Sequence, residues 1–314
     1  MEPIEITSLA DYVKYICDLN VNRNTLQNEE FLYRGHSNVK YELLPYVGRK
    51  KNDDKSDLEQ ERNLIEMAKF KMPDIFRNDM LPLELLALLQ HHEIPTRLLD
   101  VTENALVALY FACSSPENID KDGEVFVFCH CNDDVANYPL VQSIADSYRL
   151  IINKIFPLEL FFQLASNQEY FSEYKMYYNS FMSDQKLRKL VNLDKIILDT
   201  CSKPIFVYAP VRTLRQQMQS GRYILFPNKI DSTKNGTKYF VNEIKPIKKD
   251  DNCIRMIYTI KKESKRDILN DLKIMGICRK SLFCDNIDTV CEEIKNTFVP
   301  KKANTKNIDQ PTHT

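Results

Sequence analysis

Glycine is scarce in this chain: 6 of its 314 residues are glycine, about 2 % against roughly 7 % in average usage. Neither the GxGxxG pattern of dinucleotide-binding folds nor the GxxxxGK[ST] pattern of a P-loop occurs. Both patterns use glycine-rich backbone to cradle phosphates. We therefore expect neither a Rossmann-type domain nor a P-loop, and any bound nucleotide must have its phosphates held by side chains.

Long apolar runs are missing as well. No stretch approaches 18 consecutive apolar residues, and residues 1–10 lack a basic stretch followed by an apolar run. A membrane span needs the first feature and a secretory signal the second. We therefore expect a cytoplasmic protein without a membrane partner. The 9 cysteines are scattered and show no zinc-ligand spacing, which favours reduced thiols and no metal.

An excess of positive charge is also absent, because 43 Lys and Arg residues face 44 Asp and Glu residues, for a net charge of −1. This balance gives no global electrostatic footprint for nucleic acid, although a local basic patch stays open. Basic runs occur at residues 245–249, 261–262 and 265–266, and such runs are more often solvated faces than binding surfaces.

Hydrophobic residues make up 43 % of the chain, which is enough for a substantial core. Helices and strands alternate irregularly and hairpins come late, which favours an α+β fold with a mixed or antiparallel sheet and surrounding helices. The residue patterns predict helices and strands as follows: helices from 8 and at 58–71, 82–94, 103–113 and 266–275; strands at 31–33, 96–101, 124–129, 204–209 and 223–226; and a hairpin of 239–247 with 253–260.

We expect one domain that is interrupted once. Residues 1–26 form an N-terminal helix and lead-in, and residues 27–130 form the first part of the domain. A mostly helical insert follows at 131–200, and residues 201–300 complete the domain. The polar residues 301–314 are expected to be a disordered tail.

One polar cluster, Tyr33-Arg34-Gly35-His36, ends a predicted strand. An arginine in this position can present a planar fork of donors to a phosphate or a carboxylate. The structural alternative is an ion pair with a buried carboxylate such as Asp100, because buried arginines need partners.

A second cluster interrupts the next strand, where Thr96, Arg97, Asp100 and Thr102 alternate with apolar residues. A buried polar group without a partner costs about 1–3 kcal/mol. These side chains should therefore form one satisfied network, which is either structural or lines a pocket.

Together these blocks resemble the FRG domain, a bacterial family named for its aromatic-Arg-Gly motif. Two positions differ from the usual family pattern: Glu93 stands where glycine is typical, and Val101 where an aromatic is typical. The matching blocks are Phe31-Leu32-Tyr33-Arg34-Gly35, Gln90-His91, Pro95-Thr96-Arg97-Leu98-Leu99-Asp100 with Thr102, Ala108-Leu109-Tyr110-Phe111-Ala112, and Arg215 with Gln219-Ser220-Gly221-Arg222-Tyr223.

The order of these blocks is also similar to that in toxin-type ADP-ribosyltransferases: an arginine at a strand end, a Thr-bearing strand, and then a helix of the type xxAxxFA. That resemblance implies an ADP-ribosyltransferase-like fold with NAD as substrate. It implies catalytic roles for Arg34, Thr96 and Gln219. It implies cofactor binding by Tyr33, Arg34, Gly35, His91, Arg97, Asp100, Thr102, Tyr110, Arg215 and Tyr223, with one of the tyrosines stacking on nicotinamide.

The acid that this chemistry needs is not evident, since Gln219 is an amide and Gly221 stands where the final acid is usual. Glu124 and Glu243 are the other candidates. Two main hypotheses follow. The chain is an NAD-dependent toxin or defence effector that modifies a nucleic acid or protein acceptor, with an antitoxin as a further partner; or it is a non-catalytic sensor of nucleotide or nucleic acid. A nuclease is least favoured because no carboxylate cluster for metal ions occurs.

Overall fold

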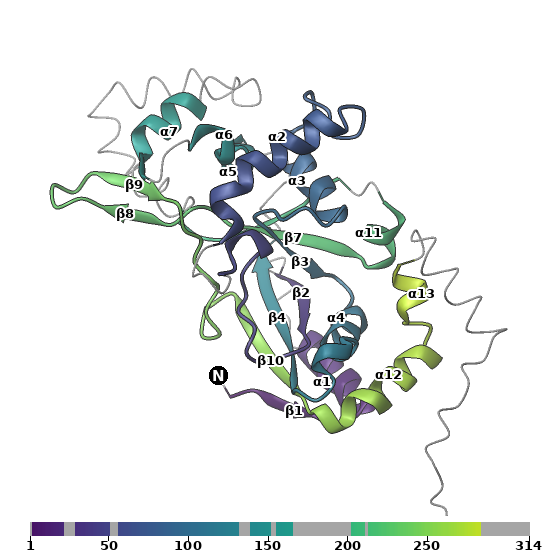
Figure 1. Cartoon of the computed structure of the whole chain (residues 1–314). Coiled ribbons are helices and arrows are strands. Elements are labelled where there is room, and N and C mark those ends of the chain that lie inside the picture. Colours follow the sequence, from purple (N-terminus) through teal and green to yellow (C-terminus); the bar gives the residue numbers. More distant parts are fainter. Residues whose placement is uncertain are drawn as a thin grey trace, which may run out of the picture.

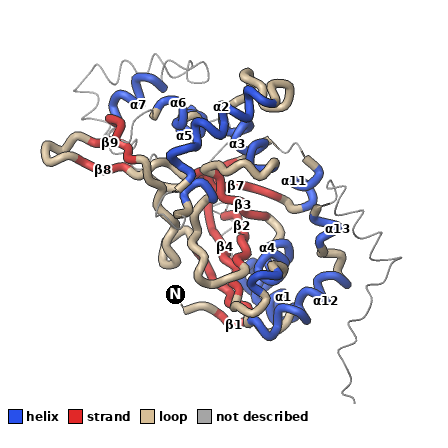
Figure 2. The backbone as a smooth tube through the Cα atoms, viewed as in Figure 1, coloured by secondary structure: helices blue, strands red, loops and turns tan. Residues whose placement is uncertain are grey.

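The computed structural model describes residues 2–21, 29–50, 56–131, 139–151, 155–165, 202–210 and 213–283. A mixed sheet of seven strands runs through the centre of this part, and helices lie against it (Figures 1 and 2). The predicted α+β class is confirmed. None of the described helices combines the length and apolar character needed to cross a membrane.

The central sheet has the order β1-β10-β4-β2-β3-β7-β6. Only β1 and β10 pair in parallel; the other neighbours are antiparallel. Its strands are β1 (Ile4–Ile6), β2 (Glu29–His36), β3 (Leu98–Thr102), β4 (Gly123–Cys131), β6 (Ile205–Val207), β7 (Gly221–Leu225) and β10 (Ile254–Ile260).

A second, antiparallel sheet has the order β5-β9-β8, from strands β5 (Ile155–Pro157), β8 (Ile230–Ser232) and β9 (Lys238–Val241). The predicted hairpin of 239–247 with 253–260 is wrong. β9 pairs with β5 and β8, whereas β10 pairs with β1 and β4 in the central sheet. The described part of residues 131–200 therefore contributes a strand as well as helices.

Three apolar clusters fill the space around the central sheet. On one face, α1, α4 and α12 pack over β2, β4 and β10, and α3 and α5 pack over β3, β6 and β7. The opposite face is covered by a third cluster that includes residues of 43–58 and 244–247. The helices are α1 (Leu9–Val21), α2 (Glu61–Lys71), α3 (Pro82–His91), α4 (Ala105–Cys113), α5 (Pro139–Ala145), α6 (Ser147–Leu150), α7 (Leu158–Ala165), α11 (Leu214–Met218), α12 (Lys265–Ile274) and α13 (Arg279–Leu282).

Helix α4 lies unusually close to the sheet because glycines face it. A Cβ atom on Gly35 would lie 1.9 Å from the Ala108 carbonyl oxygen, and one on Gly123 would lie 2.5 Å from the Ala112 carbonyl oxygen. The small residues on the facing side of α4 allow the same approach. Gly35 is therefore required by packing, whatever the role of its neighbour Arg34.

Several predicted boundaries shift. β2 continues through His36 instead of ending at Arg34-Gly35. The helix predicted at 103–113 begins at Ala105, and its N-cap is Asn104, whose side chain accepts from Leu106 N and Val107 N. The predicted helix of 266–275 is confirmed. The tail predicted at 301–314 lies outside the described residues.

Candidate functional site

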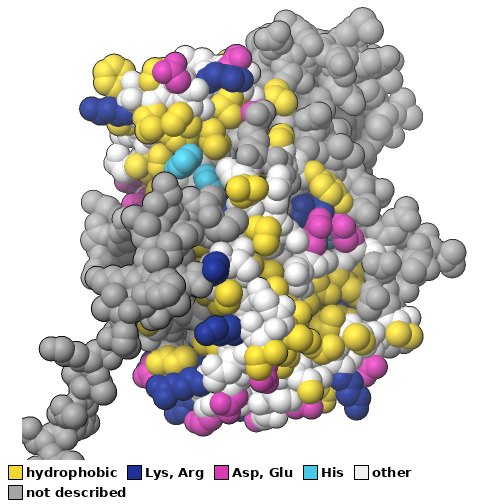
Figure 3. Space-filling view, turned by 90° about the vertical axis from the view of Figure 1, so that its right-hand side faces the viewer, with side chains coloured by type: hydrophobic (Ala, Val, Ile, Leu, Met, Phe, Trp, Pro, Cys, Tyr) yellow, Lys and Arg dark blue, Asp and Glu magenta, His cyan; other side chains and the backbone are white. Residues whose placement is uncertain are grey.

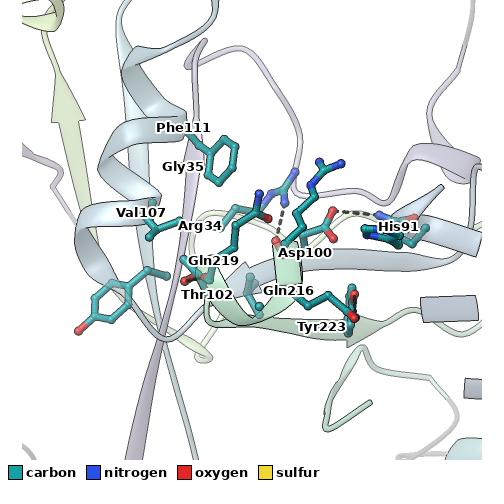
Figure 4. A pocket seen from close by; sticks show the side chains of 16 residues that line it. Arg34, Gly35, His91, Asp100, Thr102, Val107, Phe111, Gln216, Gln219 and Tyr223 are labelled. Atoms are coloured by element: carbon teal, nitrogen blue, oxygen red, sulfur yellow. Dashed lines mark hydrogen bonds between the residues drawn. The ribbon is translucent and has the colours of Figure 1, made fainter. Parts of the chain in front are cut away.

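A cavity of about 240 Å³ lies on the sheet between the two helical clusters. In Figure 4 residues of β2 and α4 lie on one side, His91 and Tyr223 on the other, and Asp100 between them. The lining residues are Tyr33, Arg34, Gly35, Gln90, His91, Asp100, Val101, Thr102, Val107, Ala108, Phe111, Arg215, Gln216, Gln219, Gly221 and Tyr223.

Arg34 reaches the cavity through a split in the sheet. β2 and β3 pair at a single position, Tyr33 with Thr102. Beyond that pair the Arg34 side chain bridges the two strands, because its Nη1 donates to the backbone carbonyl of Asp100. Nε donates to His36 Nε2 at 3.0 Å. Burial lowers the pKa of Arg34 to about 10, so the group stays charged at neutral pH.

Asp100 supplies the carboxylate of the cavity, and the side chain is exposed. Its Oδ2 accepts from Gln90 Nε2 at 2.9 Å. Gln90 Oε1 in turn accepts from the buried Thr96 hydroxyl at 2.9 Å. This chain of hydrogen bonds orients the carboxylate. The structural alternative for Arg34, an ion pair with Asp100, is thus replaced by a bond to the Asp100 backbone.

Arg215 brings a second guanidinium from α11. A capping box of Thr213 with Gln216 fixes the start of this short helix. The guanidinium carbon of Arg215 lies 4.6 Å from the centroid of the Phe283 ring, a stacked arrangement that restricts the side chain. The Thr213 hydroxyl lies 3.3 Å from His91 Nδ1, which ties α11 to the end of α3.

The floor of the cavity is held by polar contacts between β3, β7 and α11. Thr102 Oγ1 donates to the Gln219 carbonyl at 2.6 Å. Gln216 Nε2 donates to the Tyr223 hydroxyl at 2.7 Å. Burial, with the nearby Asp100 charge, raises the pKa of Tyr223, so its hydroxyl stays protonated at neutral pH. Gln219 Nε2 donates to the Leu282 carbonyl at 3.0 Å and is thereby fixed.

Three predicted binding or catalytic residues do not line this cavity. Arg97 is 1 % exposed, and its guanidinium donates to both carboxylate oxygens of Glu61 and to Asn228 Oδ1. Thr96 is buried and acts on the cavity only through Gln90. Tyr110 is buried in the cluster beside α4, and its neighbour Phe111 lines the cavity instead.

The glutamates considered as acids also lie elsewhere. Glu124 is buried and bonded to Lys249 Nζ at 2.7 and 2.6 Å. Glu243 pairs with Lys229 at 3.0 Å. Among the described residues that line the cavity, Asp100 is the sole acid. Within the same described part, no group of three or more His, Cys, Asp or Glu side chains is placed to hold a metal ion.

Sequence reasoning missed Gln90, Gln216, Val107 and Phe111 as lining residues. Gln90 precedes His91, which the sequence analysis predicts as a binding residue. Adjacent residues on a helix point in different directions, so the sequence does not indicate that both line the same cavity. Gln216 is signalled by the Thr213–Gln216 spacing, which is the [ST]xx[EQ] pattern of a capping box. Val107 carries no signal beyond its helical spacing, whereas Phe111 stands in the block Ala108-Leu109-Tyr110-Phe111-Ala112 that resembles the FRG family.

The cavity therefore offers two cations, one anion, several amides and an aromatic wall. Guanidinium groups match phosphates, amides match hydroxyls or a base edge, and aromatic rings match a planar ring. On the side of the molecule that carries α11 and α13, histidine side chains (cyan) lie exposed beside hydrophobic ones (Figure 3). At the end of α3, His91 is partly buried and His92 is exposed.

The fold and site thus define an α+β protein with an arginine-lined cavity at a split between two strands. Residues 29–121 match the family model described as the FRG domain, so the chain carries an FRG domain. No curated protein matches the chain, and no solved structure does. The match includes Arg34 and Asp100, whereas Arg215, Gln219 and Tyr223 lie beyond it.

Proposed function

We propose that this protein binds NAD or a related nucleotide in the cavity and transfers ADP-ribose from NAD to an acceptor. One observation supports the proposal most directly: Arg34, Arg215 and Asp100 come from three separate elements and line a single cavity. Guanidinium groups hold phosphates by bidentate, charge-assisted bonds. The sequence offers no glycine-rich loop for that task, so arginine side chains are the expected means.

In this reaction the bond between ribose C1′ and the nicotinamide nitrogen breaks, and its electron pair leaves with nicotinamide. Positive charge then develops on the ribose, as in glycoside cleavage. The Asp100 carboxylate is placed to stabilise that charge. An acceptor nucleophile forms the new bond to C1′ and releases its proton to water. Tyr33, Phe111 and Tyr223 supply ring faces for nicotinamide.

The cavity size restricts how much of the dinucleotide enters. Its volume is about 240 Å³, below the range of roughly 300–1,000 Å³ of most ligand pockets. We therefore place the nicotinamide riboside end inside, the diphosphate at Arg34 and Arg215, and the adenosine outside.

The second candidate function is a nucleotide sensor that binds without cleavage. It is favoured by the engagement of Asp100 Oδ2 with Gln90 and by the lack of a glutamate among the described lining residues. A sensor needs the two arginines but has no need of the carboxylate charge.

The test measures NAD binding by calorimetry and nicotinamide release by chromatography on the same variants. Asp100→Asn keeps an acceptor for Gln90 and removes the charge, so binding should change little while release falls about 100-fold or more. Arg215→Ala should weaken binding about tenfold or more, because charge-assisted bonds contribute about 1.5–3 kcal/mol. Arg77→Ala, an exposed arginine outside the cavity, is the control. Binding without release supports the sensor, and absence of binding refutes both functions.

The role as toxin or defence effector, the ADP-ribosyltransferase-like fold and an antitoxin partner are proposed from the resemblance to toxin-type ADP-ribosyltransferases, and the cytoplasmic location from the lack of a membrane span or secretory signal in the sequence.

A further inference from the structure

Residues 39–49 and 244–249 are far apart in the sequence but join on the face of the sheet opposite the helices (Figure 1). Leu43 and Ile247 form an antiparallel bridge, and Ile247 N donates to the Leu43 carbonyl at 3.0 Å. Lys249 Nζ donates to the Val39 carbonyl at 3.1 Å. The apolar residues of the first segment, Leu43, Leu44 and Val47, are buried. The polar and aromatic residues between them are therefore held on an ordered backbone.

These segments expose aromatic and basic side chains together. Tyr41 and Tyr46 are 45 % and 50 % exposed. The guanidinium carbon of Arg49 lies 5.7 Å from the centroid of the Tyr46 ring. Lys40 and Lys249 are exposed as well. We call Lys40, Tyr41, Tyr46, Arg49 and Lys249 the Tyr–Arg surface.

The Tyr–Arg surface adjoins the cavity through His36. The His36 ring lies 6.1 Å from the Tyr41 ring, and His36 Nε2 accepts from Arg34 Nε. Arg34 lines the cavity. The Asn118 amide donates to the Tyr41 hydroxyl at 2.9 Å and fixes the ring beside His36. Arg49 of the Tyr–Arg surface also interacts electrostatically with Arg34 and Asp100, which line the cavity, so a molecule bound on this surface lies beside the split between β2 and β3.

One lysine in each of the other two basic runs is engaged in the fold. Lys265 is buried and donates to the carbonyls of Ser37 and Asn118 at 2.8 and 2.9 Å. Lys261 forms ion pairs with Glu5 and Asp122. In the run 245–249 all three lysines are exposed, and Lys249 also pairs with the buried Glu124. Exposed cations thus lie on and beside the Tyr–Arg surface, although the whole chain carries a net charge of −1.

We propose that the Tyr–Arg surface binds single-stranded nucleic acid and that the acceptor of the proposed reaction is a base of that strand. This inference rests on the proposed function for the transfer step and on the surface alone for binding. Exposed aromatic rings stack on bases of any sequence, and neighbouring cations neutralise the backbone. The tyrosines distinguish this partner from an acidic peptide. The aliphatic residues Leu43, Leu44 and Val47 are buried, so none of them is available to insert into a membrane.

Binding is tested by fluorescence anisotropy with labelled single-stranded RNA and DNA of about 12 nucleotides, within the size that such surfaces cover. Tyr46→Ala should weaken binding about fivefold to 100-fold, since each stacked base contributes about 1–3 kcal/mol. Tyr46→Phe keeps the ring and should bind like wild type. Arg49→Ala should reduce the slope of log K against log salt by about 0.7, the contribution of one phosphate contact on a single strand.

Tyr15→Ala and Arg77→Ala are matched controls, because both residues are exposed and lie elsewhere. The inference is overturned if neither oligonucleotide binds at low salt, if a duplex binds more tightly, or if Tyr46→Ala binds like wild type. Binding of polyglutamate or anionic vesicles that depends on Arg49 but not on Tyr46 also overturns it.

The two proposals fail separately. Tyr46 does not line the cavity, so Tyr46→Ala should release nicotinamide into water at the wild-type rate when no nucleic acid is present. If NAD binds and no oligonucleotide does, the surface proposal is wrong and the cavity proposal stands. If oligonucleotide binding depends on Tyr46 but NAD does not bind, the cavity proposal is wrong. Parallel measurements with the RNA and the DNA oligonucleotide then show which type of nucleic acid carries the acceptor base.

Discussion

Replacing Gly35 by alanine tests whether the glycine of the aromatic-Arg-Gly motif serves packing. The added Cβ would lie 1.9 Å from the Ala108 carbonyl oxygen and 2.7 Å from the Ala112 nitrogen. Non-bonded atoms need about 3.5 Å, so α4 would have to withdraw by about 1.6 Å. Both neighbours are backbone atoms of a buried helix, which cannot rotate away.

Overpacking of this kind costs about 1–3 kcal/mol, occasionally more. We expect the upper end for Gly35→Ala, about 3 kcal/mol in the free energy of unfolding. For a domain of this size that corresponds to a fall in Tm of roughly 6–12 °C, measured by circular dichroism.

Gly221→Ala is the matched control. Gly221 lines the same cavity, but the nearest atom to its added Cβ, the Gln216 carbonyl oxygen, lies 3.5 Å away. This is ordinary contact, so Tm should hardly change. If Gly35→Ala unfolds within a degree of wild type, or no earlier than Gly221→Ala, the packing argument is refuted.

Further predictions concern stability. Glu93 has φ 63°, and left-handed backbone costs a non-glycine residue about 1–2 kcal/mol, so Glu93→Gly should raise the free energy of unfolding by about 0.5–1 kcal/mol in urea titrations. Arg97→Ala leaves Glu61 buried without its cation and should cost about 3–5 kcal/mol, whereas Arg77→Ala, at an exposed pair, should cost under 1 kcal/mol. Burial, with the Arg34 charge nearby, holds the pKa of His36 well below 6.5. As the pH is lowered, the unfolded chain therefore protonates this histidine before the folded chain does. The free energy of unfolding should decrease by up to about 1.4 kcal/mol for each pH unit below 6.5. His36→Gln should show a flatter pH profile between pH 6.5 and 5; an unchanged slope would show that His36 is not responsible.

The sequence was sufficient for features that depend on local patterns. The α+β class follows from the order of elements. The polar residues in and before β3 also stood out, because they interrupt an apolar run. The sequence did not show which of these residues line the cavity and which lie in the core, because that depends on partners distant in the sequence. Arg97 is satisfied by Glu61 and Asn228, which lie 36 and 131 residues from it.

The wrong hairpin has a related cause. Strands that are close in sequence usually pair, and residues 239–247 and 253–260 were joined on that basis. β9 instead pairs with β5, a strand from the region expected to be a helical insert. Nothing local in β9 signals that partner. The split between β2 and β3, which admits Arg34 to the cavity, likewise arises from long-range pairing of each strand with its other neighbour.

The most direct test of the central claim is a crystal structure of the protein with NAD or ADP-ribose bound. The account predicts a diphosphate between the guanidinium groups of Arg34 and Arg215, with the ribose facing the Asp100 carboxylate. A ligand bound away from these three side chains, or a cavity that stays empty at saturating nucleotide, would contradict it.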